Sequence, residues 1–303
     1  MLSNVDTKKQ EVQAICIAPT GLLALQLCED AISKLAKHMD PPCRVELAVK
    51  PEDKNDHGPP KGASCPAHVV VGTVGTITKY LKQKYIKPEG VKIFVVDEAD
   101  KMIDEAEGSA STQLKQIKGK LPTTVQKVFF SATFSPTILK LANTILEGKV
   151  TEIRVDDAEL ILDKIFQVKI DCRKRSKIDI LEDVYSYFAL QQSMVFCESR
   201  AGCEEVAAKL RKDGFKCSVI HGKTTDVHEE FKLFRQSKTK VLFCTDILSR
   251  GIDVTTVGVV INYEIPRLFV QGIGFTENVN CETYAHRIAR CCRMANPGTA
   301  ITL

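Results

Sequence analysis

The chain alternates between short, strongly apolar runs and longer segments in which apolar residues recur at helical spacing. The apolar runs are rich in β-branched residues and contain few polar side chains. Strands of this kind are buried on both faces, which predicts parallel sheets covered by helices. We expect strands at 14–18, 69–72, 93–96, 127–130, 165–170, 194–197, 217–220, 240–244, 257–262 and 299–303.

Helix signals lie between these strands. Ser135-Pro136 predicts an N-cap followed by proline at the first helical position. Ser199 predicts the cap of another helix, which Gly214 would end, and a third helix is expected to begin near Glu282. The alternation of strands and helices occurs twice over, so the predicted fold class is α/β with two domains.

The length of 303 residues is sufficient for two domains of ordinary size. We expect the first domain at 1–155, a linker at 156–164 and the second domain at 165–303. The polar stretch 151–164 favours that linker position. The segment 50–67 is rich in proline, glycine and charge, which predicts a surface loop.

Composition narrows the class of protein. Hydrophobic residues make up 44% and charged residues 26%, as in ordinary globular proteins, and no apolar stretch reaches the roughly 20 residues that span a bilayer. We expect no signal peptide and no membrane association. The net charge of +4 permits nucleic-acid binding but does not argue for it. Twelve cysteines without a Cys-x-x-Cys pair predict reduced, buried thiols in a cytosolic or nuclear protein, and argue against zinc.

The tetrapeptide Asp-Glu-Ala-Asp at 97–100 directly follows the apolar run 93–96. An apolar strand that stops at paired acids is typical of RecA-type ATPases. One carboxylate holds Mg²⁺ and the next polarises the attacking water. Taken alone, the tetrapeptide also fits an acidic loop after a buried strand.

Two further motifs end strands in the first half. Ser131-Ala132-Thr133 carries small hydroxyls that can bond strand-end carboxylates, although a helix-capping cluster is the simpler interpretation of the motif by itself. The glycine–threonine segment at 72–76 could bring backbone amides close to phosphates near a helix N-terminus. An ordinary strand-to-helix turn explains that segment equally well.

The second half has its own motifs. The segment 245–253 follows a strand and ends in an acid suited to a ribose hydroxyl. Arg287, Arg290 and Arg293 are spaced three apart, so the last two project from one side of a helix or its end. Two guanidiniums there would compensate the charge of a transferring phosphoryl group, whereas a solvated basic face is the alternative. The Gly-Lys-Thr at 222–224 does not predict a phosphate loop, because Cys217 stands where such a loop needs glycine.

In this order, the motifs resemble those of the DEAD-box RNA helicases, over essentially the whole chain. Within that family the chain is similar to the mRNA-export helicases of the nuclear pore, and a polar insert at 267–280 adds to the likeness. The residues that carry the resemblance are Pro19-Thr20, Gly72-Thr73, 97–100, 131–133, 194–199, His221-Gly222, 245–253 and 284–293, with Val-Gly-Thr-x-Gly-Thr at 71–76, 129–134 and 262–266 for the subgroup.

The resemblance implies two tandem RecA-like domains with parallel sheets, which close over ATP and Mg²⁺ and clamp single-stranded RNA. Asp97 would hold the metal, Glu98 would be the general base, Arg290 and Arg293 would touch the γ-phosphate, and Asp253 would bind ribose. Other nucleotide-linked positions would be Asp100, Ser131 and Thr133. The RNA phosphates would lie along Pro19, Thr20, Gly72, Thr73, Arg200, Gly222, Thr245 and Arg250.

The resemblance also implies partners and location. We expect a monomer that acts on single-stranded RNA or an mRNP, with a cytoplasmic-face nucleoporin and an inositol-polyphosphate-dependent activator as protein partners. The expected location is cytoplasmic and nuclear, including the nuclear pore.

The chain departs from the family pattern at its start. Met1 lies only 18 residues before Pro19, and neither the adenine-reading Gln motif nor the Gly-x-x-x-x-Gly-Lys-Thr loop (Walker A) occurs. We therefore expect an N-terminally truncated, incomplete first domain without the amide cradle for the β- and γ-phosphates. We also expect the absent strand to lie beside strand 93–96, which would expose an apolar sheet edge.

The last motif differs as well. Ala289 and Cys292 stand in place of glycines and Cys291 in place of a threonine, and the extra side chains could crowd the approach of Arg290 and Arg293 to a phosphate.

Three hypotheses follow. The retained acids and arginines favour a fragment or an incomplete gene product of an active ATP-dependent RNA helicase, or RNP remodeller, of the mRNA-export type. The missing phosphate loop favours a catalytically inactive RNA- or export-factor-binding relative. An unrelated α/β protein is disfavoured by the ordered motif set. We predict a helicase by descent that binds ATP weakly and turns over little or none as this chain alone.

Overall fold

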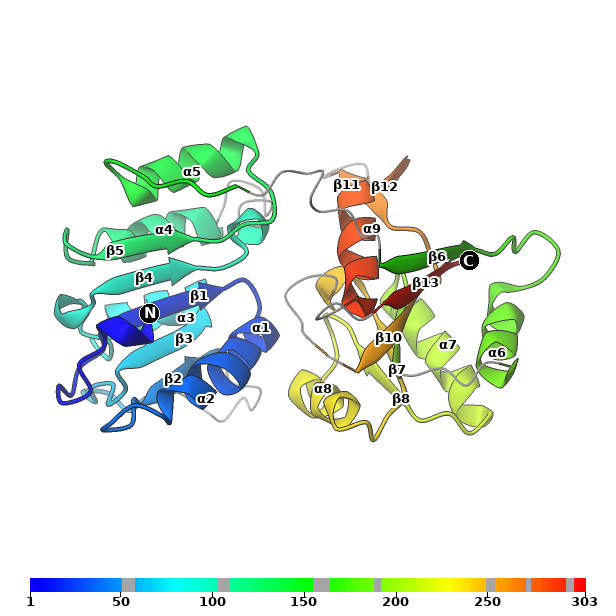
Figure 1. Ribbon diagram of the computed structural model, residues 1–303, viewed down its shortest axis with the longest axis horizontal. Helices are drawn as coiled ribbons and strands as arrows, with labels where there is room; N and C mark the ends of the chain where they lie inside the picture. The colour runs from blue at the N-terminus through cyan, green and yellow to red at the C-terminus, as the bar shows by residue number, and fades with distance from the viewer. Residues whose placement is uncertain are drawn as a thin grey trace. The chain divides into compact units, whose positions relative to one another are not determined.

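The computed structural model describes residues 1–50, 58–102, 109–154, 164–187, 192–248, 254, 256–270, 274–292 and 297–303. The chain divides into two compact units, Met1–Ile153 and Arg154–Leu303 (Figure 1). Each unit has its own parallel sheet and helices. The predicted linker 156–164 lies outside the described residues except for Lys164, so its bounds stay a prediction.

Unit 1 contains five parallel strands in the order β2-β3-β1-β4-β5. The strands are β1 (Ala14–Ala18), β2 (Val45–Ala48), β3 (Val69–Thr73), β4 (Ile93–Val96) and β5 (Gln126–Phe129). Four of them lie where the apolar runs predicted strands. β2 was not predicted, because it is a short edge strand with Glu46 in its middle and is held by backbone pairing to β3.

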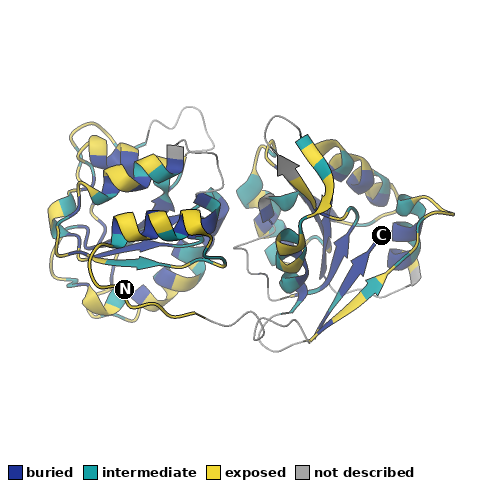
Figure 2. Ribbon diagram, turned by 90° about the horizontal axis from the view of Figure 1, so that it is seen from above, coloured by how far each residue is buried: buried dark blue, intermediate teal, exposed yellow. Residues whose placement is uncertain are grey.

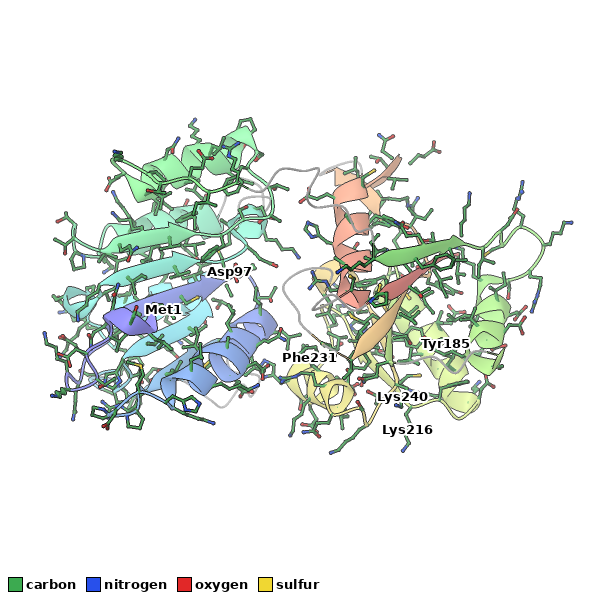
Figure 3. The ribbon with its side chains drawn as sticks, in the orientation of Figure 1. Met1, Asp97, Tyr185, Lys216, Phe231 and Lys240 are labelled. Carbon is green, nitrogen blue, oxygen red and sulfur yellow. The ribbon has the colours of Figure 1, made fainter. Side chains whose placement is uncertain are left out.

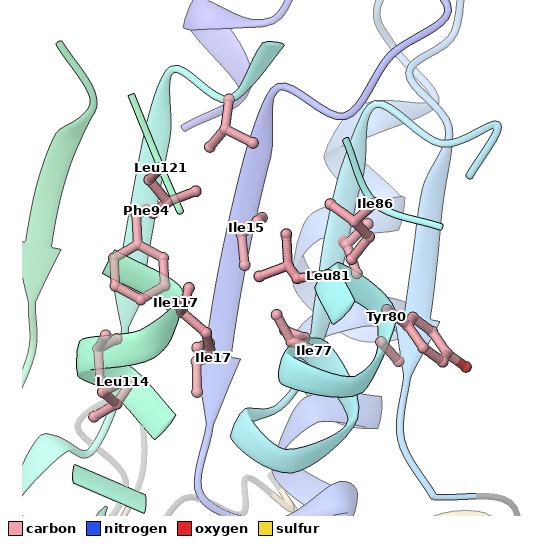
Figure 4. Packing of buried hydrophobic residues seen from close by; sticks show 14 of the residues in the cluster. Ile15, Ile17, Ile77, Tyr80, Leu81, Ile86, Phe94, Leu114, Ile117 and Leu121 are labelled. Carbon is pink, nitrogen blue, oxygen red and sulfur yellow. The ribbon is translucent and has the colours of Figure 1, made fainter. Parts of the chain in front are cut away.

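Helices cover both faces of this sheet. They are α1 (Gly21–Gln26), α2 (Ser33–Ala36), α3 (Val74–Lys82), α4 (Ser109–Lys118) and α5 (Pro136–Leu146). One face packs residues such as Ile15 and Phe94 against Ile77 of α3 and Leu114 of α4 (Figure 4). The other face packs against α1 and α2. The cap Ser135 accepts from the Ile138 N–H, as the Ser-Pro signal predicted.

The expectation that strand β4 has an exposed edge is wrong. β4 pairs with β1 on one side and with β5 on the other, so its apolar residues lie inside the sheet. The outer strands are β2 and β5, and Phe130, which follows β5, is 56% exposed. Neighbour relations in a sheet depend on chain crossovers, which a strand's own sequence does not encode.

Unit 2 contains six parallel strands in the order β6-β13-β10-β7-β9-β8. Its central strands are buried, as Figure 2 shows by their dark colour. The strands are β6 (Ile165–Lys169), β7 (Gln192–Phe196), β8 (Cys217–Ile220), β9 (Val241–Cys244), β10 (Val257–Asn262) and β13 (Gly298–Thr302). All six were predicted within two residues at each end. Five of them are mostly buried, as their apolar runs predicted, whereas in the edge strand β6 only Ile165 is buried.

The helices of unit 2 are α6 (Lys177–Tyr187), α7 (Arg200–Lys212), α8 (Val227–Arg235) and α9 (Cys281–Ile288). Ser199 caps α7, and Gly214 follows its end with a φ of +87°. The helices α6 and α7 pack on one face of the sheet through Leu181 and Val206.

The polar insert 267–280 forms an antiparallel hairpin, β11 (Arg267–Val270) with β12 (Gly274–Val279). No strand was predicted there, because among the described strands the two of the hairpin pair only with each other, and β12 buries little of its surface. No helix in the described part of the chain is long and apolar enough to cross a membrane.

Candidate functional site

The carboxyl ends of the parallel strands in unit 1 bring its predicted site residues to one edge of the sheet. Pro19 and Thr20 follow β1, Gly72 and Thr73 end β3, and Asp97 follows β4 (Figure 3). Ligand sites of open parallel sheets form at such an edge, because successive loops leave the sheet there. The fold thus gathers motifs that lie far apart in the sequence.

Asp97 is held at this edge by its backbone and has a perturbed carboxyl group. Its N–H donates to Ile17 O at 2.9 Å, and its Oδ1 accepts from the Glu98 N–H at 3.0 Å. Burial raises the pKa of the Asp97 carboxyl and the charge of Asp100 raises it further, while the Glu98 N–H bond opposes both. A divalent cation at Asp97 would offset the cost of burying this charge, so the residue fits the predicted role of magnesium ligand.

Glu98 adopts the left-handed backbone region, with φ of +46°. This conformation is costly for a residue with a Cβ, and it occurs here at the turn directly after β4. Backbone strain of this kind is often found at functional sites. Here it determines the direction in which the chain leaves the sheet at Glu98.

Asp100 and Ser131 meet across the ends of β4 and β5. Asp100 is 1% exposed, and its Oδ1 accepts from the Ser131 hydroxyl at 2.9 Å and from the Ala132 N–H at 3.4 Å. Ser131 Oγ also lies 2.6 Å from Thr133 O. The two motifs 97–100 and 131–133 are therefore joined by hydrogen bonds. The sequence had indicated only that the hydroxyls of 131–133 can bond a carboxylate at a strand end.

Two of the residues predicted to bind RNA in unit 1 have structural explanations. Thr20 caps α1 by accepting from the Leu23 N–H at 3.2 Å. At Gly72, an added Cβ would lie 2.0 Å from Ala48 O, so the close approach of β2 requires glycine. Neither contact decides whether RNA binds there, and that role stays a prediction.

In unit 2, a second set of predicted residues gathers at strand ends. Arg200 begins α7 after β7, Gly222 follows β8, and Thr245 follows β9. Arg200 lies against Gly222, since a Cβ on that glycine would be 3.4 Å from Arg200 Nη2. Two positions predicted to bind RNA are therefore neighbours. Arg250, Asp253 and Arg293 lie outside the described residues.

Arg287 is a buried residue of the last motif to which the sequence analysis assigned no role. It is 1% exposed, and its Nε donates to Asp246 Oδ1 at 2.6 Å. Its Nη1 donates to Glu264 O at 2.7 Å and to Asn262 Oδ1 at 3.3 Å. Its guanidinium carbon lies 5.1 Å from the centre of the Phe196 ring. The signal available in the sequence was Asp246, an acid close after a buried strand, which could have predicted an arginine partner.

Arg290 lies in a 3₁₀ turn, Ala289–Cys291, that follows α9. Its Nε donates to His286 O at 3.1 Å, so it is placed at the helix end. Cys291 faces the interior, where its Sγ donates to Ile288 O at 3.0 Å, and burial raises its pKa to about 11. The cysteine in place of threonine is thus packed inside unit 2.

Among the described residues, no group of three or more His, Cys, Asp or Glu side chains could hold a metal ion. Magnesium in nucleotide sites uses one or two carboxylates together with phosphate oxygens and water, so it requires no such group. Asp97 is the described carboxylate that fits this mode.

Comparison with known proteins supports these assignments of fold and family. The DEAD/DEAH box helicase model matches residues 1–141, and the helicase conserved C-terminal domain matches residues 176–295. The chain is 34% identical over 305 residues to ATP-dependent RNA helicase DBP5 of Scheffersomyces stipitis, covering 100% of this chain and 57% of that protein. It thus spans little more than half of that relative.

Solved structures give the same result. S. cerevisiae Dbp5 bound to RNA and ADP BeF3 superposes with a TM-score of 0.84 at 31% identity, covering 99% of this chain and 73% of that one. A variant of the same protein bound to nup159, gle1, ip6 and adp has a TM-score of 0.68 at 30% identity, covering 99% and 74%. Both units thus have the RecA-like fold of these helicases, and the chain belongs to the DEAD-box helicase family, with DBP5 RNA helicases among its relatives.

Proposed function

We propose that this chain forms the two remodelling units of an ATP-dependent RNA helicase of the mRNA-export type, which acts on single-stranded RNA or mRNPs. The observation that carries the proposal is the position of two acids at the carboxyl edge of the unit 1 sheet, where Asp97 accepts from the Glu98 N–H and the buried Asp100 accepts from the Ser131 hydroxyl. This arrangement combines a carboxylate suited to magnesium with a buried acid tied to the next strand.

The nucleotide would be held by this edge. Asp97 would hold Mg²⁺, which supplies charge compensation for the phosphates when bound. Glu98 would accept the proton of the attacking water, and its turn after β4 sets its position. From unit 2, Arg290 and Arg293 would contact the γ-phosphate and Asp253 the ribose.

RNA would lie along the strand ends of each unit. Candidates are Pro19, Thr20, Gly72 and Thr73 in unit 1, and Arg200, Gly222, Thr245 and Arg250 in unit 2. Contacts from backbone amides, hydroxyls and arginines address phosphates and sugars, so binding would not depend on base sequence. The contact of Asp100 with Ser131 would couple the nucleotide edge to the neighbouring loop at Thr133.

A second candidate function is binding of RNA or an export factor without hydrolysis. The observation in its favour is the last motif, in which Ala289 and Cys292 stand in place of glycines and the buried Cys291 in place of a threonine. By analogy with the complex of S. cerevisiae Dbp5, partners would include a nucleoporin and an activator that uses an inositol polyphosphate. The expected location is cytoplasmic and nuclear, at the nuclear pore.

The deciding experiment measures binding of a fluorescent, non-hydrolysable ATP analogue to the purified chain, with and without single-stranded RNA, followed by ATP turnover. Mg²⁺-dependent binding strengthened by RNA, with turnover lost in Glu98→Gln, would support the enzyme. RNA binding without nucleotide binding would support the second candidate. Loss of both would contradict the proposal as a whole.

A further inference from the structure

Strand β6 forms the outer strand of the unit 2 sheet and pairs with β13 on one side only (Figure 1). The Gly298 N–H donates to Lys164 O at 3.0 Å, and the Ile170 N–H donates to Thr302 O at 2.9 Å. Backbone groups alternate in direction along a strand, so the even-numbered residues of β6 face β13. The N–H and C=O groups of Gln167 and Lys169 therefore point away from β13, where no described strand pairs with them.

A mainly apolar cavity of about 360 Å³ lies beside these two residues. Val168 of β6, Ile265 after β10, Val279 of β12 and Tyr284 of α9 contribute to its walls. Its volume falls within the range of ligand pockets and would accept a large apolar side chain. The Tyr284 hydroxyl donates to Gln167 Oε1 at 3.0 Å, so these two polar groups of the wall already hydrogen-bond to each other.

The apolar surface continues from the cavity onto the hairpin. Ile265 is 39% exposed, Phe275 is 49% exposed and Val279 is 46% exposed. Phe275 and Val279 both belong to β12 and are four residues apart, so they share one face of that strand. Exposed apolar side chains beside an open strand edge are a surface that another chain can cover.

The charge along β6 indicates what kind of chain would fit. Lys164 and Lys169 lie at the two ends of the strand and are exposed. Further basic residues follow the strand, where Arg173 pairs with Asp171 and Arg175 with Asp183. The acids Glu277 and Glu282 belong to β12 and α9, and strand β6 itself contains no acid. Acidic side chains would therefore be favoured along β6 itself.

We propose that the open edge of β6 and the adjoining cavity dock an extended, acidic peptide segment of another protein. The segment adds a strand beside β6, bonds to the backbone of Gln167 and Lys169, and inserts one apolar side chain between Ile265, Val279 and Tyr284. This mode of binding draws affinity from backbone hydrogen bonds and specificity from the side-chain pocket. It is independent of nucleotide and of the RNA residues proposed above.

The test uses the full 303-residue chain and fluorescein-labelled ten-residue peptides with a central leucine, isoleucine or phenylalanine and flanking aspartates and glutamates. A matched set carries lysines in the flanks. We expect at least one acidic peptide to bind about tenfold or more tightly than its lysine counterpart, and Val279→Glu or Lys169→Glu to weaken it by about tenfold, or about 1.4 kcal/mol. Ile153→Glu, at an 86% exposed position in unit 1, is the control and should leave the affinity unchanged.

Amide hydrogen exchange provides a second measurement on the same samples. Bound peptide should slow exchange at Gln167 and Lys169, whose N–H groups face the open edge, and leave Phe166 and Val168 nearly unchanged. Absence of peptide binding, binding that Val279→Glu does not weaken, or unchanged exchange at Gln167 and Lys169 would each overturn the proposal. Displacement of the peptide by a single-stranded RNA that protects the same amides would assign the site to RNA and overturn it as well.

Discussion

Arg287 and Asp246 are 41 residues apart in sequence, and their side chains meet with Nε and Oδ1 at 2.6 Å. The arginine is 1% exposed, whereas the aspartate side chain is 45% exposed. The remaining donors of the guanidinium are directed to Glu264 O and Asn262 Oδ1. One buried side chain therefore holds α9, which precedes Arg290, against the ends of β9 and β10.

Replacement of this arginine should destabilise unit 2. Arg287→Ala removes a buried charge together with its hydrogen bonds to Asp246 Oδ1, Asn262 Oδ1 and the partly buried Glu264 O, so we expect a loss of about 3 kcal/mol. Chemical denaturation of the variant would measure it. Arg173→Ala is the control, because its ion pair with Asp171 is exposed to solvent and should contribute little to stability. Equal losses in the two variants would contradict a special role of Arg287.

Ser131→Ala should weaken unit 1 through Asp100. The variant removes a hydroxyl donor from a carboxylate that is 1% exposed, which should cost about 1 to 3 kcal/mol. Thr133→Ala is the matched control, since Ser131 approaches the backbone oxygen of Thr133, which the substitution retains. Urea denaturation of both proteins tests the difference, and a larger loss in Thr133→Ala would show that the hydroxyl contact with Asp100 is unimportant.

The stability contribution of Asp97 should depend on pH with a defined sign. Folding raises the pKa of its carboxyl above 3.8, so the folded chain binds more protons than the unfolded chain between the two values. The contribution is favourable below pH 3.8 and is lost as the pH rises through the raised pKa. Asp97→Asn, which can keep the bond from the Glu98 N–H, should therefore raise the urea midpoint more at pH 7.5 than at pH 4.5.

Asp171 provides the opposite case. Its hydrogen bonds with Arg173 lower the pKa of the Asp171 carboxyl, so any stabilisation is present above pH 3.8 and is lost as the pH falls. Asp171→Asn should therefore not raise the urea midpoint at pH 7.5. For Asp97, the contrary result is an increase in the urea midpoint of Asp97→Asn that is the same at pH 7.5 and pH 4.5. That result would argue against the burial of the Asp97 charge.

Gly72→Ala should prevent the approach of β2 to β3. The new Cβ would lie 2.0 Å from Ala48 O, a backbone atom that cannot move without shifting the strand, so we expect a loss of about 3 kcal/mol. Gly75→Ala in α3 is the control, because its Cβ would lie 3.8 Å from Gln113 Oε1 of α4. This substitution should add about 0.5 to 1 kcal/mol of stability. Thermal or urea unfolding of the pair would compare them, and a stable Gly72→Ala chain would contradict this packing.

The sequence by itself determined the strands that are buried on both faces, the helix caps at Ser135 and Ser199, and the placement of chemical motifs at strand ends. These features are local, because double-sided burial demands apolar runs and a cap depends on residues within one turn. The family resemblance rests on the same local motifs, and the comparisons confirm it.

The tertiary structure decided the rest. It showed that β4 lies between β1 and β5, that the insert 267–280 forms a hairpin, and that Arg287 is buried against Asp246. It also placed the open edge of β6 beside the cavity at Ile265 and Val279. Each of these depends on residues far apart in sequence, whose pairing is determined by chain crossovers and packing and leaves no local pattern to detect.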